Sequence, residues 1–288
     1  MIHEEVKLPA PAYERAWSSI KIDGAVKDRL VAQALLALQL RGQFSFEELP
    51  LHGLLVLEGP PGTGKTTLAR GLANRVSEFL KPKGAAFLEI DPHAMASSAL
   101  GRSQKEVSKL FTELIPERAA NGPCIVLFDE IETVAADRKR LSLEANPIDV
   151  HRATDAALAG IDLLARKKLP IVLLATTNFV DAVDSALLSR ADWIEKIPLP
   201  NAEARAAIID DVLRVLATRW PQIGKIAKSV KSLVAASEGL DGRRIRKAIV
   251  SAGASNVDVA MDLNKLTVDQ IVRTFRNVKA ERLAEQVA

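Results

Sequence analysis

Short apolar runs alternate with stretches of helical periodicity between residues 50 and 200 of the chain. Five runs have the length of buried strands, and they cover residues 53–58, 86–90, 125–128, 171–176 and 193–197. Apolar residues three and four positions apart predict amphipathic helices in the gaps, for example over 65–80 and 104–119. Strands and helices that alternate in this way are typical of a parallel sheet with helices on both faces. We therefore expect a large α/β domain over residues 51–199.

The regions on either side of this domain have a different pattern. The pattern over residues 24–40 predicts a helix that precedes the α/β domain, and the pattern over 41–51 predicts a loop. Residues 1–50 are therefore expected to form an N-terminal lead-in to that domain. After a Pro-Leu-Pro turn at 198–200 the strand signals stop, and the helical periods that follow cover 202–217, 223–236, 241–254 and 267–285. Because proline breaks both strands and helices, this turn is a natural boundary. A small, all-helical domain over 200–288 is expected.

Composition excludes several classes of protein. Apolar residues make up 48% of the 288 residues, enough for a core, and no apolar run approaches the roughly 18 residues that cross a bilayer. The N-terminus carries Glu4 and Glu5 where a signal peptide has bases. Cys124 is the single cysteine, so an internal disulfide and a multi-cysteine metal site are both excluded. We expect a cytoplasmic protein without a membrane partner.

The charge pattern does not favour a nucleic-acid partner. Lys and Arg number 39 against 36 acidic residues, a net charge of +3. An excess is found only locally, because residues 219–288 carry 13 basic and 7 acidic residues. Aromatic residues make up only 4% of the chain, which leaves little material for stacking on bases. A solvated basic helical face accounts for the local excess.

A glycine-rich phosphate-binding motif follows the first predicted strand and opens a helix. It matches G-x-x-x-x-G-K-[ST], a loop whose backbone N–H groups surround phosphate oxygens at the positive end of the helix. Lys65 is expected to reach the β- and γ-phosphates and Thr66 to bind Mg²⁺. The residues expected to bind ATP here are Gly59, Pro60, Pro61, Gly62, Thr63, Gly64, Lys65, Thr66 and Thr67.

Two adjacent acids, Asp129 and Glu130, follow the apolar run 125–128. They stand at the carboxyl end of a predicted strand, the edge where open α/β sheets bind ligands. Asp129 fits a carboxylate that holds Mg²⁺, and Glu130 fits a base for the attacking water. Acids are also common at helix N-termini, but after a phosphate-binding loop this pair favours hydrolysis of the nucleotide over simple switching.

Three further polar residues are candidates for the same chemistry. Asn178 comes shortly after the run 171–176, and it would stand beside Asp129 if the two strands are neighbours, where its amide could hold a water. Arg190 precedes the last strand and Arg243 opens a predicted helix of the small domain. A guanidinium can stabilise a transferring phosphoryl group. Asparagines in turns and surface arginines are both common, so chemistry alone leaves these three assignments open.

Taken in order, these motifs resemble those of AAA+ ATPases, and the resemblance covers roughly residues 17–254. It implies that the glycine-rich loop is Walker A, the acid pair Walker B, and Asn178 the residue called sensor 1. It also implies that Arg190 is the arginine finger, acting on the neighbouring subunit's nucleotide, and that Arg243 is sensor 2. Ile22 and Asp23 resemble the family's lead-in, which lines the adenine pocket. The implied architecture is a five-stranded parallel sheet of the P-loop NTPase fold with a helical lid, usually assembled as a hexameric ring.

A narrower resemblance is to the pachytene-checkpoint AAA+ ATPases. It rests on the segments 16–20, 146–162, 189–192 and 239–243. Members of that family use ATP to unfold or convert HORMA-domain proteins, and bacterial members accompany anti-phage systems that make cyclic nucleotides. The resemblance therefore implies a HORMA-domain protein as partner. Two departures are the short region before the phosphate-binding loop and the absence of an aromatic in the first pore loop.

In that loop, Ala99 stands where threading members place an aromatic residue. Met95 and Leu100 remain as apolar candidates to grip a polypeptide, and the alternative for Leu100 is a local core position.

These observations favour an ATP-hydrolysing ring that unfolds or remodels a protein. The alternative is a nucleic-acid motor or loader with the same ATPase core. The basic C-terminal region and the basic cluster 138–140 favour this alternative. A nucleotide-gated scaffold without turnover is disfavoured by Glu130.

Overall fold

The computed structural model describes residues 1–91, 104–135 and 147–287, which form two compact units. The first contains Met1–Ile20, Gly24–Gly59 and Lys65–Ile197. The second contains Lys21–Asp23, Pro60–Gly64 and the chain from Pro198 onward. The candidate pore residues Met95 and Leu100, the position Ala99 and the basic cluster 138–140 lie outside the described residues. Among the described helices, none combines the length and the apolar composition of a membrane span.

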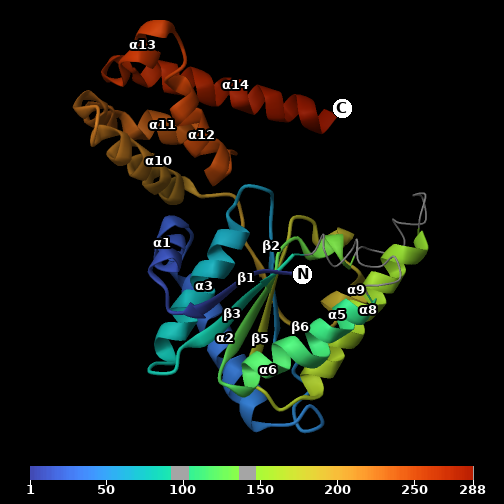
Figure 1. Ribbon diagram of the computed structural model, residues 1–288. Helices are drawn as coiled ribbons and strands as arrows, with labels where there is room; N and C mark the ends of the chain where they lie inside the picture. Colours follow the sequence, from blue (N-terminus) through green and yellow to red (C-terminus); the bar gives the residue numbers. More distant parts are fainter. Residues whose placement is uncertain (92–103, 136–146, 288) are drawn as a thin grey trace. The chain divides into compact units, whose positions relative to one another are not determined.

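The first unit is built on a sheet whose five parallel strands lie in the order β3, β4, β5, β2, β6 (Figure 1). Each strand agrees with a predicted apolar run to within two residues at either end. Every residue of the central strand, β5, is buried, which explains why its sequence is continuously apolar up to its final threonines. The predicted parallel α/β fold is confirmed, with strands β2 (Leu54–Glu58), β3 (Ala85–Ile90), β4 (Cys124–Phe128), β5 (Ile171–Thr177) and β6 (Ala191–Lys196).

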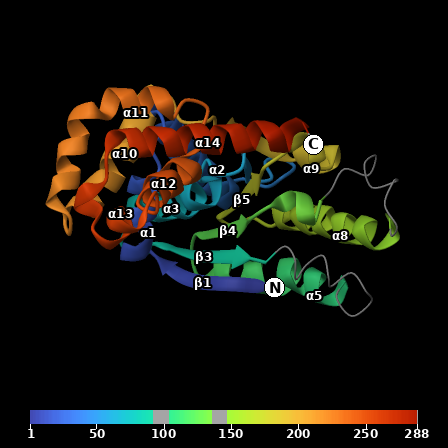
Figure 2. The same cartoon turned by 90° about the horizontal axis from the view of Figure 1, so that it is seen from above.

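A sixth strand, β1 (Ile2–Leu8), was not predicted, so the expectation of a five-stranded sheet was wrong by one strand. This strand pairs antiparallel with β3 at the edge of the sheet (Figure 2). Its residues from His3 to Glu5 are exposed and only Leu8 is buried. Polar residues are usual on an edge strand, where they discourage pairing with another chain. The same polar residues removed the apolar signal on which the prediction relied.

Helices cover both faces of this sheet (Figure 1). On one face lie α2 (Gly24–Gln43) and α3 (Lys65–Phe79), and α1 (Pro11–Ser19) packs on α3. A Cβ atom at Gly71 of α3 would lie 2.6 Å from the Trp17 backbone, so glycine permits this close approach. On the other face lie α5 (Gln104–Lys109), a π-helical turn (Leu110–Leu114), α6 (Ile115–Ala120) and α8 (Pro147–Arg166). The remaining elements are short: α9 (Ser185–Leu188) and the 3₁₀ turns Ile131–Thr133 and Val180–Ala182.

The leading helix α2 extends three residues beyond its predicted end, and the buried cation Arg41 explains this. Its Nη1 donates to the carbonyl of Ile171 at 2.8 Å and its Nη2 to the carbonyl of Leu164 at 2.5 Å. Burial lowers the pKa of Arg41 to about 10, so the guanidinium stays charged at neutral pH. These bonds satisfy carbonyls at the end of α8 and the start of β5, and they fix α2 to the sheet.

The second unit is helical after Pro198, as predicted, and has its own apolar core around Ile208, Leu233 and Phe275. Side-chain caps set the starts of several helices: Asn201 accepts from Ala204 N at 2.8 Å and Asn256 from Val259 N at 2.9 Å. The helices are α10 (Ala202–Ala217), α11 (Val230–Ala236), α12 (Gly242–Ala252), α13 (Val257–Met261) and α14 (Val268–Val287), with 3₁₀ segments at Pro221–Ser229 and Leu263–Lys265.

The predicted helix over 223–236 is therefore a 3₁₀ segment followed by α11. Ile223 and Ile226 are both buried, and residues three apart share a face in a 3₁₀ helix, which has three residues per turn.

Candidate functional site

The predicted site residues of the sheet unit, except Arg190, lie at or just after the carboxyl ends of three neighbouring strands. Strand β5 lies between β2 and β4, with Glu58 opposite Thr177 and Phe128 opposite Ala175. Gly59, Asp129 and Asn178 each follow one of these strands directly. Parallel strands end at the same edge, so the three residues emerge side by side. The prediction for Asn178 required that the strand before it lie next to the strand before Asp129. The structure meets this requirement, because β5 pairs with β4.

Lys65 and Thr66, the first residues of α3, connect these strand ends. The buried Lys65 ammonium donates to the carbonyl of Gly59 at 2.7 Å and to Asn178 Oδ1 at 2.9 Å. The Thr66 hydroxyl donates to Asp129 Oδ1 at 2.7 Å. A cation, a hydroxyl, a carboxylate and an amide therefore meet at one point of the sheet edge. Thr67, in the same helical turn, is half-buried.

Thr176 is a further member of this site that the sequence analysis did not single out. Its hydroxyl donates to Asp129 Oδ1 at 2.5 Å and accepts from the backbone N of Glu130 at 3.1 Å. Glu130 has a φ of 51°, and it is the single non-glycine residue with positive φ in the described part of the chain. A left-handed backbone costs roughly 1–2 kcal/mol and persists only where neighbouring groups hold it. Thr176 supplies part of that restraint and so sets the direction of both acids.

Glu132 makes the reciprocal link from β4 back to β5. Its Oε1 accepts from the backbone N of Asn178 at 3.0 Å, while its Oε2 is buried with no hydrogen-bond partner in the described residues. A buried polar atom without a partner costs about 1–3 kcal/mol, and the hydrogen bond that Oε1 accepts from Asn178 N offsets part of this cost. A hydroxyl residue before Asn178 and a second glutamate after Glu130 are the sequence signals that could have indicated these two residues.

We expect Thr176→Val to lower kcat for ATP about 10- to 100-fold, because a hydrogen bond to a charged group contributes roughly 1.5–3 kcal/mol. Thr176→Ser keeps the hydroxyl and should recover most of the activity. Thr177→Val is the matched control, because its buried hydroxyl accepts from Phe179 N at 3.1 Å and contacts neither acid. Steady-state ATPase assays across a range of Mg²⁺ concentrations measure the effect. Wild-type kcat in Thr176→Val would show that the hydroxyl does not position the acids.

The second unit contains the remaining predicted nucleotide-binding residues. Gly62 has a φ of 84°, and a Cβ atom there would collide with the side chain of Asp241. Asp241 is buried and caps α12 by accepting from Arg244 N at 2.9 Å. The backbone N of Arg243 donates to the carbonyl of Gly62 at 3.3 Å, and the Arg243 side chain is exposed. The tip of the phosphate-binding loop is thereby tied to the start of α12.

Ile22 and Asp23 belong to this same unit, with Ile22 half-buried and Asp23 exposed. Within the loop, the Thr63 hydroxyl donates to the carbonyl of Pro60 at 2.9 Å.

Arg190 lies at the amino ends of the strands, whereas the glycine-rich loop and the acid pair follow their carboxyl ends. It directly precedes Ala191, which pairs with Leu54 at the amino end of β2, whereas the glycine-rich loop follows Glu58 at the carboxyl end. At about 3.3 Å per residue, five residues of strand separate the two ends by about 17 Å. The Arg190 guanidinium pairs with Asp162, at 2.6 Å from Nε and 2.8 Å from Nη2. The structure therefore does not bring Arg190 to the other predicted catalytic residues.

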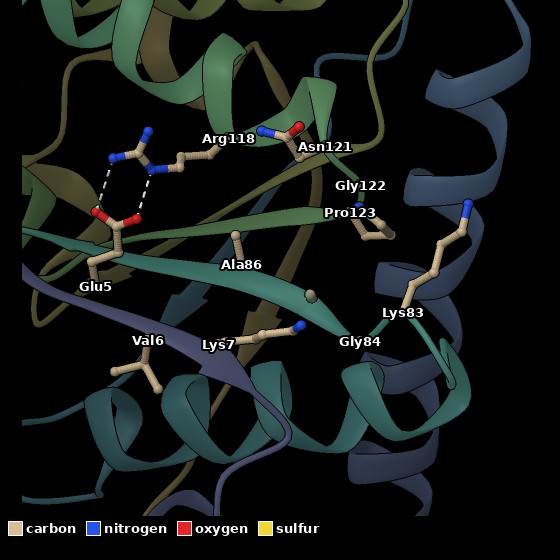
Figure 3. Close-up of a pocket in the computed structure, with 11 residues that line it drawn as sticks. Glu5, Val6, Lys7, Lys83, Gly84, Ala86, Arg118, Asn121, Gly122 and Pro123 are labelled. Atoms are coloured by element: carbon tan, nitrogen blue, oxygen red, sulfur yellow. Dashed lines mark hydrogen bonds and ion pairs between the residues drawn. The ribbon is translucent and has the colours of Figure 1, made fainter.

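A hollow of about 280 Å³ also lies away from the Walker motifs (Figure 3). It opens where β3 and β4 begin, next to Gly122 and Pro123, and not at the carboxyl ends of the strands. A bidentate ion pair between Arg118 and Glu5 forms one side of it, with 2.6 Å between Nε and Oε1. None of the predicted site residues lines this hollow, so it is not the nucleotide site.

The residues at the strand ends fit a nucleotide with a magnesium ion. Lys65 offers a cation, and the start of α3 offers the N–H groups that any helix leaves unpaired in its first turn. Thr66 and Asp129 offer two oxygen donors that already lie within hydrogen-bonding distance of one another, and oxygen donors are the ligands that Mg²⁺ prefers. Glu130, exposed beside them, is available to accept a proton.

Comparisons with known proteins agree with this chemistry. The sequence model of the family described as "ATPase family associated with various cellular activities (AAA)" matches residues 55–199, half of the chain. CD-NTase-associated protein 6 of Pseudomonas aeruginosa is 48% identical over 284 residues, which cover 98% of this chain and 93% of that protein. The putative pachytene checkpoint protein 2 of Caenorhabditis elegans is 32% identical over 73% of this chain, which spans about half, 50%, of that relative's length.

Two solved structures show the same fold. A chain in the structure of the E. coli MS115-1 HORMA:CdnC:Trip13 complex matches with a TM-score of 0.76 at 20% identity, covering 96% of this chain and 95% of that one. The structure of C. elegans PCH-2 matches with a TM-score of 0.73 at 25% identity, covering 97% of this chain and 75% of that one. Since the family match covers half of the chain and the P. aeruginosa relative nearly all of it, this chain is an ATP-binding ATPase that belongs to the AAA family.

Proposed function

We propose that this ATPase uses ATP hydrolysis to unfold or remodel a HORMA-domain protein that regulates a bacterial anti-phage signalling system. The observation that carries the proposal is the 48% identity to CD-NTase-associated protein 6 along 98% of the chain. The fold shared with a chain of the HORMA:CdnC:Trip13 complex supports the choice of a HORMA-domain partner. The relation to pachytene checkpoint protein 2 supports the same class of activity.

The strand-end residues perform the hydrolysis in this proposal. Lys65 binds the β- and γ-phosphates, and Thr66 and Asp129 hold a magnesium ion that neutralises phosphate charge when bound. Glu130 takes a proton from the attacking water, and Asn178 orients that water. The hydrogen bonds from Lys65 to Asn178 and from Thr66 to Asp129 support this division of roles, because they place each group at the start of α3.

The other predicted residues act around the nucleotide. Ile22 and Asp23 line the adenine site, and Arg243 senses the phosphates from the helical lid, residues 200–288. Residues 51–199 form the ATPase domain and residues 1–50 its lead-in. Arg190 acts on the nucleotide of a second copy, since about 17 Å of strand separates it from its own phosphate-binding loop. Such a role requires that copies of the chain assemble side by side, and we propose a hexameric ring.

The experiment compares a HORMA-domain protein from the same organism with DNA. We expect the HORMA-domain protein to stimulate ATP turnover and to become protease-sensitive in the presence of ATP, whereas double- and single-stranded DNA have no effect. Lys65→Ala, which lacks the phosphate-binding cation, is the control and should leave the HORMA-domain protein resistant. Stimulation by DNA alone would instead support the nucleic-acid motor and overturn the proposal.

A further inference from the structure

The guanidinium of Arg190 is held along one edge. Its Nε and Nη2 donate to the two carboxylate oxygens of Asp162 at 2.6 and 2.8 Å, and its Nη1 donates to the carbonyl of Ala186 at 2.6 Å. An arginine has five N–H donors, one on Nε and two on each terminal nitrogen. One N–H on each of Nη1 and Nη2 therefore has no acceptor among the residues that the structure describes. On Nη2, the N–H beside Nε is used by Asp162, so the remaining N–H lies at the end of the fork, the edge suited to phosphate oxygens.

Asp162 is itself fixed in place. It lies on α8 next to the buried Ile161, and His52 Nε2 lies 3.4 Å from its Oδ1. The backbone of His52 is in turn held by Asp192, whose Oδ1 accepts from His52 N at 3.2 Å. Burial lowers the pKa of His52, which favours its neutral imidazole. The hydrogen bonds from Arg190 also lower the pKa of Asp162, which keeps this carboxylate ionised.

We propose that Asp162 is the positioning residue of Arg190: it grips the side edge of the guanidinium so that the end edge is presented to phosphates bound by a second copy of the chain. This inference rests on the proposed role of Arg190 in trans. An unrestrained arginine samples many rotamers, and a donor fixed in advance stabilises transition-state charge without reorganising at the moment of reaction. Asp162 acts through Arg190 and contacts neither ATP nor the reacting water of its own site.

Asp162→Asn keeps the size of the side chain but removes the charge and one acceptor. We expect kcat for ATP to fall about tenfold or more, with the KM for ATP changed less than about twofold, because ATP is bound at the other edge of the sheet. Asp162→Glu, which retains a carboxylate, should recover part of kcat. The matched control is Glu5→Gln, which breaks a bidentate pair of the same kind with Arg118 near the hollow of Figure 3. This control should hydrolyse ATP at the wild-type rate.

A double-mutant cycle tests whether Asp162 acts through Arg190. In an Arg190→Ala background, Asp162→Asn should cause no further loss of kcat, since the group that it positions is gone. Mixing tests the direction of action: Asp162→Asn should regain activity with Lys65→Ala, which supplies an intact Asp162–Arg190 pair. It should gain nothing from Arg190→Ala, which supplies none.

Each remaining outcome has a defined meaning. Wild-type kcat in Asp162→Asn, while Arg190→Ala is inactive, would overturn the positioning role and leave the proposed function standing. A higher kcat in Asp162→Asn would show that the pair restrains Arg190, which also overturns the proposal. Loss of kcat together with a lowered Tm and no recovery on mixing would make Asp162 a structural residue. An active Arg190→Ala would remove the role of Arg190 in trans, and with it this inference.

Discussion

Arg190→Ala should bind ATP with wild-type affinity and hydrolyse it about 10³- to 10⁵-fold more slowly, the range known for loss of an arginine finger. Binding survives because Arg190 stands at the amino end of β6, whereas Lys65 and Asn178 meet at the carboxyl ends of the strands. Hydrolysis fails because no other residue that we assign to the site supplies a cation from a second copy. Kd for a fluorescent ATP analogue and single-turnover hydrolysis measure the two effects separately.

Two comparisons make this prediction specific. Arg118→Ala also removes an arginine from a bidentate ion pair at a half-exposed position, and it should leave hydrolysis unchanged. Mixed with Lys65→Ala, itself inactive, Arg190→Ala should regain some turnover, because intact Lys65 sites then face intact Arg190 residues. Absence of any recovery, once co-assembly has been demonstrated, counts against action in trans.

The strands that carry the site were predictable because both faces of the sheet are covered. A strand buried on both faces must be apolar at every position, and β4 and β5 meet that requirement up to Phe128 and Ala175. The polar residues that follow then stand out, and the chemistry of Asp129 and Asn178 could be assigned from type and position. Strand β1 lacked such a signal, because an edge strand is required to bury only part of its length.

Contacts between side chains far apart in the sequence were not predictable in the same way. Thr176 and Glu132 join the site through hydrogen bonds across neighbouring strands, and Asp162 reaches Arg190 over 28 positions of sequence. Each of these residues is of a common type, and its place in the sequence, even close to Asn178 or Glu130, does not by itself distinguish it from a solvated or capping residue. Their hydrogen-bond partners become evident only from the register of β4 and β5 and from the packing of α8.

The division of the phosphate-binding loop was also invisible in the sequence. Its motif is continuous from Gly59 to Thr66, yet Pro60–Gly64 belongs to the helical unit while Gly59 and Lys65 belong to the sheet unit. Gly62 explains the assignment, because its missing side chain makes room for Asp241. The motif predicts phosphate binding for all of its glycines. It does not indicate that Gly62 also permits close packing against Asp241 within the second unit.

Glu130→Gln should retain ATP and lower turnover about 10²- to 10⁴-fold, the contribution expected of a general base. The amide has the shape of the carboxylate but cannot take a proton from water. The surroundings of Glu130 should survive the change, because its backbone N is held by the Thr176 hydroxyl at 3.1 Å whatever the side chain. Steady-state hydrolysis and the amount of unhydrolysed ATP that co-purifies with the protein measure the two effects.

Glu130→Gly separates the carboxylate from the backbone that carries it. Glycine adopts a φ of 51° without the steric cost that glutamate has there, so this variant should unfold at a Tm no lower than that of the wild type. Its turnover should nevertheless be as low as that of Glu130→Gln, since both lack the base. Activity and stability would thus move independently at one residue, which is expected where a strained backbone serves catalysis. Near-normal hydrolysis by either variant would show that Glu130 is not the base.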